Sequence, residues 1–188
     1  MIGNYWNSSR PTKHLFILSG MLLLISGIAW LSGVRYNQTE SYPLGFWVLS
    51  GGYQEGSKGV LVLYCPSDSE IFETARERGY LASGYHCESG IAPLLKKVIA
   101  VKGDKVSISG KGIFVNDSFI ADSVPFKKDG LGRDLPSLAV EEVLSKNQVL
   151  LYSDYNSRSY DGRYFGVVNE DGIEGLIKPV FTWSDQNY

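Results

Sequence analysis

The most apolar part of the chain lies near its start. About 20 consecutive residues, 15–34, carry no ionisable side chain and no regular polar stripe. In a helix, about 20 residues rise roughly 30 Å, which matches the hydrocarbon thickness of a bilayer. A helix on the surface of a globular domain would instead carry polar residues along one face. The pattern therefore predicts a membrane-spanning helix at residues 15–34, after a short segment at residues 1–14.

Basic residues indicate how this helix is oriented. Arg10 and Lys13 precede the span, as does the N-terminal amine, and Arg35 follows it. Because basic residues favour the cytoplasmic side, we expect the N-terminus in the cytoplasm and residues 35–188 outside it. A cleaved secretory signal is the alternative, but the run is long for such a segment and ends without a small-x-small cleavage site. A retained anchor is the favoured interpretation.

After the span, short apolar segments alternate with Gly, Asn, Asp and Pro, which is typical of strands joined by turns. Asn116 and Asp117 separate two such segments and predict a tight hairpin turn. The sequence thus predicts a mainly β domain over residues 35–188. The predicted strands are residues 60–64, 98–101, 106–109, 113–115, 119–120, 149–152 and 176–183.

One helix is expected within this β domain. Ser67 followed by Glu70 has the spacing of a capping box, and residues 70–78 (EIFETARER) form the helix body. Gly79 is placed to end it. The later stretch at residues 127–146 is polar and is expected to be a surface excursion with a short helical turn or two.

Two cysteines, Cys65 and Cys87, flank the predicted helix. Two are too few for a disulfide-rich scaffold, and whether they pair depends on the compartment of the domain. Since residues 35–188 are expected outside the cytoplasm, we hypothesise that Cys65 and Cys87 close an inserted lobe at about residues 65–90.

Composition narrows the range of functions. The chain has 18 basic and 20 acidic residues and a net charge of -2, so it lacks the positive field that binds nucleic acid. With 21 glycines and 7 prolines, it suits a turn-rich β domain. After an anchor, 188 residues leave room for one globular domain.

Common hydrolytic motifs are absent from the sequence: there is no His-Glu-x-x-His, no phosphate-binding loop and no Gly-x-Ser-x-Gly. Of the two histidines, His14 lies at the membrane boundary, so a Ser-His-Asp triad would have to use His86. A lysine can replace histidine as the base where burial lowers its pKa. We expect no metal and no cofactor. Composition alone does not select a serine and lysine pair.

Three sequence blocks resemble a known family, and this resemblance selects the serine and the lysine. The blocks are residues 36–47 (YNQTESYPLGFW), 94–104 (LLKKVIAVKGD) and 154–166 (DYNSRSYDGRYFG). In this order behind an N-terminal span, they resemble the signal peptidase I family of Ser-Lys proteases. The pattern Asn-x-Thr-x-Ser-x-Pro-x-Gly in the first block, with the cysteine lobe, is similar to the conjugative-transfer branch of that family.

The resemblance implies that Ser41 is the nucleophile and Lys96 the general base. In a strand, Lys96 and Lys97 would face opposite sides, so one of them would point inward. The structural alternatives are that Ser41 is an ordinary turn serine and that the two lysines guard an edge strand.

Further roles follow from the same resemblance. Thr39 matches a residue that supplies a hydroxyl to the oxyanion hole, and Ser159 matches one that holds the lysine amine. The resemblance places Asp161 with Ser41 and Lys96 among the catalytic residues, and Asp161 and Arg163 are expected to form an ion pair that shapes the site. Asp154 also matches the pattern but is equally compatible with a turn. The chain departs from the family pattern at Tyr42, Ala100, Lys102, Ser153, Tyr155 and Gly162.

The resemblance therefore implies a signal-peptidase-like β domain anchored in the bacterial inner membrane, with its active site in the periplasm. The expected activity is endopeptidase cleavage of an exported, pilin-like precursor, with or without joining of the product ends. One alternative is a general leader peptidase. The non-enzymatic alternative is an anchored assembly component of a pilus or secretion complex.

Overall fold

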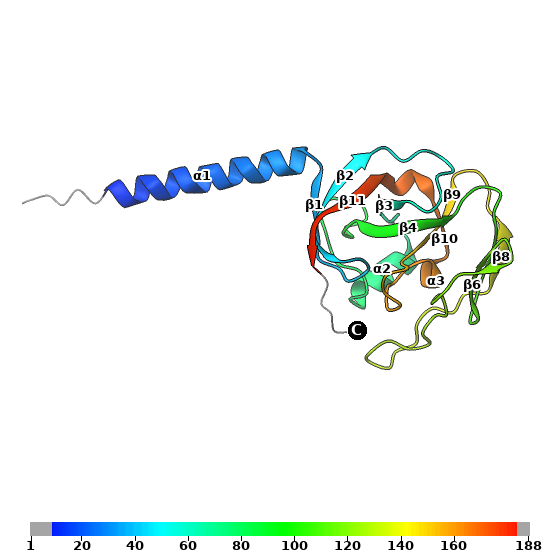
Figure 1. The fold of residues 1–188 in the computed structure, drawn as a ribbon. Coiled ribbons are helices and arrows are strands. Elements are labelled where there is room, and N and C mark those ends of the chain that lie inside the picture. Colours follow the sequence, from blue (N-terminus) through cyan, green and yellow to red (C-terminus); the bar gives the residue numbers. More distant parts are fainter. Residues whose placement is uncertain (1–8, 184–188) are drawn as a thin grey trace, which may run out of the picture.

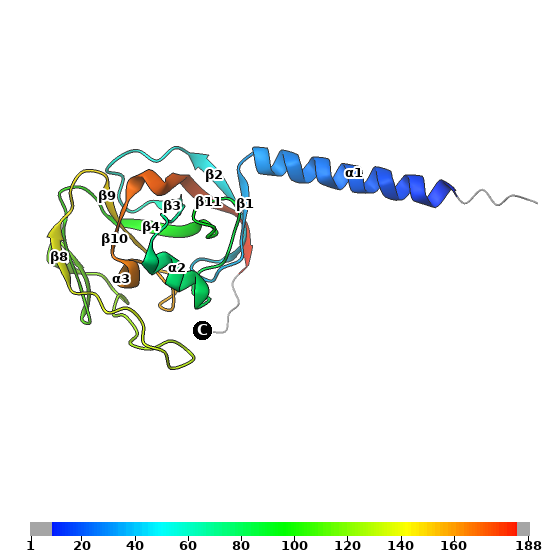
Figure 2. The same ribbon diagram turned by 180° about the vertical axis from the view of Figure 1, so that it is seen from behind.

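The computed structural model describes residues 9–183, and a long helix projects from a β domain (Figures 1 and 2). Helix α1 spans Ser9–Leu31, and its apolar segment Thr12–Leu31 is not buried against the rest of the protein. The helix ends at Leu31 and not at residue 34, because Gly33 adopts φ +80° and its N–H donates to the Trp30 carbonyl. Val34 already belongs to the first strand.

Eleven strands form two antiparallel sheets within the described residues. The larger sheet has the order β1-β2-β11-β3-β4-β9-β10, and the smaller has the order β7-β6-β5-β8. The mainly β prediction is therefore confirmed. The strands are β1 (Val34–Asn37), β2 (Leu44–Gly51), β3 (Leu61–Tyr64), β4 (Leu94–Ala100), β5 (Lys105–Ser109), β6 (Gly112–Val115), β7 (Ser118–Phe119), β8 (Val140–Val143), β9 (Gln148–Tyr152), β10 (Val167–Asn169) and β11 (Ile173–Trp183).

Each predicted strand overlaps an observed one, and the predicted turn at Asn116 and Asp117 joins β6 to β7. Both turn residues have positive φ, 50° and 62°, as a two-residue hairpin turn of this kind requires. Residues 127–146 form the predicted surface excursion, but the helical turns predicted within it are wrong. That segment holds β8 and a bridge between Lys128 and Asp134 in place of a helical turn. Strand β8 was not predicted from the local sequence, because its pairing partner, β5, lies far away in the chain.

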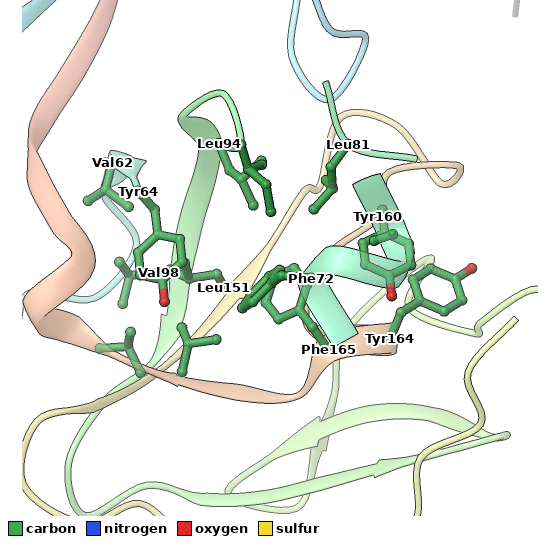
Figure 3. Close-up of a cluster of buried hydrophobic side chains, with 14 residues drawn as sticks. Val62, Tyr64, Phe72, Leu81, Leu94, Val98, Leu151, Tyr160, Tyr164 and Phe165 are labelled. Atoms are coloured by element: carbon green, nitrogen blue, oxygen red, sulfur yellow. The ribbon is translucent and has the colours of Figure 1, made fainter. Parts of the chain in front are cut away.

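Helix α2 (Glu70–Glu77) packs on the larger sheet and closes the main hydrophobic core. Phe72 lies 5.1 Å from Phe165, measured between ring centroids, and both side chains are buried with Leu94 and Val98 of β4 (Figure 3). The residue at the N-cap is Ser69, so the predicted cap at Ser67 was wrong. Two short helices complete the chain, α3 (Gly162–Phe165) and a 3-10 turn (Glu170–Gly172).

The hypothesis that the cysteines pair is confirmed. Cys65 and Cys87 form a disulfide across 22 positions, with their Cα atoms 5.4 Å apart. Cys65 directly follows β3, and the loop closed by the bridge contains α2 before the chain returns to β4. The bridge thus fastens the lobe between two adjacent central strands, and the second of these carries Lys96.

We expect the paired substitution of Cys65 and Cys87 by serine to lower the free energy of unfolding by about 3 kcal/mol, because the unfolded chain gains the freedom of a long loop. Urea unfolding of the full chain in detergent would measure this. The oxidised protein should lose the same stability when it is reduced. Equal stability of the reduced, oxidised and substituted proteins would contradict the assigned role of the bridge.

Candidate active site

The segment that carries Ser41 is a turn between β1 and β2, and the side chain of Asn37 holds it in shape. The Asn37 amide donates to the carbonyls of Thr39, Tyr42 and Pro43 at 2.9–3.1 Å. Its oxygen accepts the Thr39 N–H at 3.2 Å and the Thr39 hydroxyl at 3.0 Å. Asn37 therefore binds both ends of the turn and fixes the backbone on each side of Ser41.

Lys96 lies on β4, which is flanked by β3 and β9 in the middle of the larger sheet. Its side chain is only 2% exposed, so the interpretation of a lysine guarding an edge strand is wrong. The Lys96 amine donates to the hydroxyls of Ser41 and Ser159, each at 2.7 Å, and the two hydroxyls are 3.0 Å apart. Three residues that are distant in sequence thus form one compact triangle.

Burial lowers the pKa of Lys96 to about 8 from its ordinary value of 10.5. The Asp161 carboxylate opposes this shift, and the Arg163 guanidinium adds to it. About a tenth of the amine is then neutral at pH 7, and the fraction rises steeply with pH. A neutral amine at 2.7 Å can accept the proton of the Ser41 hydroxyl and leave a nucleophilic oxygen.

Lys97 points to the opposite side of the strand and forms an ion pair with Asp154. Asp154 also accepts a hydrogen bond of 2.6 Å from the hydroxyl of Tyr42, the residue after Ser41. Burial alone would raise the pKa of Asp154, but the hydrogen bonds from Lys97 and Tyr42 lower it. Asp154 is therefore more than a turn residue, since it joins β4 to the Ser41 segment.

Asp161 and Arg163 form the predicted ion pair, with N–O distances of 2.8 and 2.9 Å and both side chains fully buried. Arg163 also donates to the carbonyls of Ser157 at 2.6 Å and Ser159 at 2.9 Å. The guanidinium thus fixes the backbone that carries Ser159. Asp161 forms no hydrogen bond with Ser41 or Lys96 within the described residues. It acts on the triangle by holding Arg163 and through its own charge, which favours the protonated form of Lys96.

Two departures from the family pattern prove to be structural. The Ser153 hydroxyl donates to the Ser41 carbonyl, and the Ser153 N–H donates to Asp161 at 3.1 Å. A Cβ on Gly162 would lie 2.6 Å from the Leu151 carbonyl, so the chain passes β9 closely only with glycine there. The sequence did not give Asn37 or Ser153 a role. Its one signal was a polar residue, Ser153, where the family pattern has glycine.

Thr39 is two residues from Ser41, but its hydroxyl donates to Asn37 and makes no bond to Ser41. The Ser41 N–H donates to no acceptor among the described residues. This N–H is therefore available to a ligand, whereas the Thr39 hydroxyl must first leave Asn37 before it can donate to one.

A pocket of about 220 Å³ is lined by residues from β1, β2, β4 and β11 and from the end of α1. Its walls include Asn37, Thr39 and Leu95, which are close in sequence to Ser41 or Lys96. Trp47 and Ile177 add apolar surface, and Trp30 from the end of α1 contributes to the rim. This pocket suits small apolar side chains.

His86 lies away from Ser41, and it forms an ion pair with Glu174 and contacts the ring of Trp30. The interpretation of a Ser-His-Asp triad is therefore wrong.

Among the residues that the structure describes, Cys65, His86 and Glu174 are spaced as metal ligands could be. Cys65 is in the disulfide and offers no thiolate, so only two ligands remain.

The chain is similar to known proteins over most of its length. The profile of signal peptidase, peptidase S26, matches residues 12–183. A plasmid transfer protein TraF of Escherichia coli is 41% identical over 93% of this chain and 97% of its own length. A conjugal transfer protein TraF of Agrobacterium tumefaciens is 37% identical over 93% of this chain and 98% of its own. A solved signal peptidase I of Enterococcus faecalis has a TM-score of 0.38 and 15% identity, covering 66% of this chain and 98% of that one.

We expect the Lys96 amine to lose its proton near pH 8, well below the ordinary lysine pKa of 10.5, because burial disfavours its charged form. NMR of protein labelled at the lysine side chains would follow this titration in detergent micelles. The Lys96→Met variant assigns the signal, and Lys111→Met, at an exposed hairpin, serves as the control. Titration of Lys96 together with the exposed lysines would contradict the buried geometry.

We expect Asp161→Asn to lower the free energy of unfolding by about 3 kcal/mol, because it leaves the Arg163 charge buried without its ionic partner. Asp117→Asn is the matched control, since Asp117 pairs with Lys105 on the surface and its loss should change stability by less than about 1 kcal/mol. Urea unfolding of both full-length variants measures the difference. Equal effects of the two substitutions would show that the buried pair has no special role.

Proposed function

Because this chain belongs to the signal peptidase family, peptidase S26, we propose that it is a serine endopeptidase with Ser41 as nucleophile and Lys96 as general base. One observation supports this most strongly: the buried Lys96 amine lies 2.7 Å from the Ser41 hydroxyl oxygen. A lysine buried in the core of a sheet lowers the stability of the fold, so its presence there favours a functional role. A protein that only docks to partners has no need for such a lysine.

The proposed reaction begins when neutral Lys96 takes the proton of the Ser41 hydroxyl. The Ser41 oxygen attacks the carbonyl carbon of the scissile peptide bond and forms a tetrahedral oxyanion. The Ser41 N–H donates to this oxyanion, and the Thr39 hydroxyl joins it after leaving Asn37; such a donor typically contributes about 3 kcal/mol. The intermediate then collapses, Lys96 returns its proton to the leaving amine, and the acyl group remains on Ser41.

Two acceptors can complete the cycle. Lys96 is neutral again after the first step, so it can deprotonate a water or a peptide amine that attacks the acyl-enzyme. The bond between the acyl carbon and the Ser41 oxygen then breaks, and Lys96 returns the proton to that oxygen. Water gives a linear product, whereas the amine at the other end of the same substrate gives a ring. The Ser159 hydroxyl accepts a hydrogen bond from Lys96 and shares one with the Ser41 hydroxyl, and Arg163 and Asp161 keep Ser159 in place. Asp154 and Tyr42 position the Ser41 segment from the other side.

The proposed substrate is an exported, pilin-like precursor of a conjugative transfer system. The relatives named as plasmid or conjugal transfer proteins span nearly the whole chain, which supports this choice over a general leader peptidase. We assign the small apolar residues before the cleaved bond to the pocket lined by Thr39, Trp47 and Leu95. No metal or cofactor takes part in the proposed steps.

The proposed location is the bacterial inner membrane, with the β domain in the periplasm. Helix α1 fits a single-pass anchor, and Lys13 at its N-terminal end favours the cytoplasm for that end. The β domain also presents exposed aromatic side chains beside the anchor, namely Tyr36, Phe46, Phe181 and Trp183. Aromatic residues of this kind are favourable at the membrane interface, so they would hold the active site close to a membrane-bound substrate.

We expect Ser41→Ala and Lys96→Met each to abolish peptide cleavage while leaving the protein folded. The measurement is incubation of the full chain in detergent with a proteome-derived peptide library, with new ends identified by mass spectrometry. The unchanged protein should cut after small residues, and Lys111→Met should behave like it. A cyclic product would be lighter than the linear one by one water. Cleavage that survives in either variant would refute the dyad.

A further inference from the structure

A second hollow, of about 610 Å³, lies between the C-terminal end of α2 and the excursion at residues 126–135. We call it the tyrosine groove. Tyr80, Tyr160 and Tyr164 form its floor, with neighbouring ring centroids 5.4 and 5.2 Å apart and the rings nearly parallel. Figure 3 shows Tyr160 and Tyr164 at the outer end of the main core, beyond Phe72. The excursion is fixed to α2, because Arg133 donates to the Arg78 carbonyl and Arg78 donates to the Asp134 carbonyl.

The walls of the tyrosine groove carry an excess of positive charge. Asp129 is paired with Arg133 and also accepts a hydrogen bond of 2.7 Å from Tyr80. The excursion's other acid, Asp134, is paired with Lys128. Among the described residues, the guanidinium groups of Arg78 and Arg158, which also line the groove, form no ion pair with a carboxylate. Arg158 is exposed, and its side chain makes no hydrogen bond or ion pair within residues 9–183.

The loop that carries Ser159 also contributes Arg158 and Tyr160 to the tyrosine groove. Arg158 directly precedes Ser159, whose hydroxyl contacts both Ser41 and Lys96. In the same loop, the Asn156 side chain donates to the Glu40 carbonyl, next to Ser41. The groove shares no lining residue with the apolar pocket, which is bounded by residues 37–39 and 92–95. The two hollows are therefore separate, and the residues on both sides of Ser159 line the tyrosine groove and not the apolar pocket.

We propose that the tyrosine groove is a second substrate-binding site, which takes an acidic segment of the polypeptide that is cleaved at Ser41. Guanidinium groups bind carboxylates through paired, charge-assisted hydrogen bonds, and Arg78 and Arg158 are the two guanidinium groups here that no carboxylate occupies within residues 9–183. The tyrosine floor offers contact to the aliphatic or aromatic side chains between the acids. This inference rests on the proposed function, since it assigns the groove to the same substrate. It adds a charge preference that the apolar pocket does not have.

Binding of an acidic peptide to the Ser41→Ala chain tests the proposal without catalysis. The probe is fluorescein-labelled Gly-Glu-Asp-Glu-Tyr-Gly, and its neutral match is Gly-Gln-Asn-Gln-Tyr-Gly, both followed by fluorescence anisotropy in detergent. We expect the acidic peptide to bind about tenfold more tightly, and added salt to reduce the difference. Arg158→Gln and, separately, Arg78→Gln should weaken it about fivefold or more, whereas Lys111→Gln should not.

Equal affinity for the two peptides, or affinity unchanged in both arginine variants, would overturn the proposal. Vesicles containing phosphatidylglycerol provide a further arm. If these vesicles displace the acidic peptide and Arg158→Gln weakens vesicle binding, the groove is a lipid site and the proposal fails. The proposed function is judged separately. A wild-type chain that binds the acidic peptide selectively but cleaves nothing refutes the protease alone, and cleavage without acid selectivity refutes the groove alone.

Discussion

The burial of one lysine amine is the constraint on which the rest of the site depends. Lys96 is 2% exposed in the middle of the larger sheet, where a charged ammonium is strongly disfavoured. Its hydrogen bonds to Ser41 and Ser159 satisfy the amine, and the low pKa lets it become neutral near physiological pH. The energy that disfavours the charge is also what makes the amine a useful base. The neighbouring Arg163 contributes in the same direction, while Asp161 keeps that arginine paired.

The partners of Lys96 lie on loops, so the chain has to fix them by other means. Each loop is held by one side chain that bonds to several backbone groups. Asn37 binds the carbonyls on both sides of Ser41, and Arg163 binds the carbonyls around Ser159. Ser153 joins the two loops through the Ser41 carbonyl. The disulfide and α2 brace the same region from the lobe between β3 and β4. Preorganisation of this kind keeps the reacting groups in place before substrate arrives.

The sequence predicted the features of this structure that depend on residues close together in the chain. The apolar run indicated α1, and alternation around Lys96 and Lys97 indicated that one lysine points inward. Resemblance then selected Ser41, Lys96 and Ser159, which the structure brings together. The membrane-spanning helix was predicted to end at residue 34, but the positive φ of Gly33 stops α1 at Leu31. β8 and the roles of Asn37 and Ser153 were missed because each depends on a partner brought by the fold. The Ser153 hydroxyl and the Ser41 carbonyl are separated by 112 positions in the chain.

The most direct test of the central claim is the pH dependence of acylation at Ser41. The acetyl-alanine 4-nitrophenyl ester would be mixed with the full chain in detergent, and the modified residue would be located by mass spectrometry. The account predicts that acylation falls on Ser41 and that its rate rises with pH around an apparent pKa of about 8, as Lys96 loses its proton. The rise should vanish in Lys96→Met. A rate that does not depend on pH between 6 and 10, or one that Lys96→Met leaves unchanged, would contradict the account.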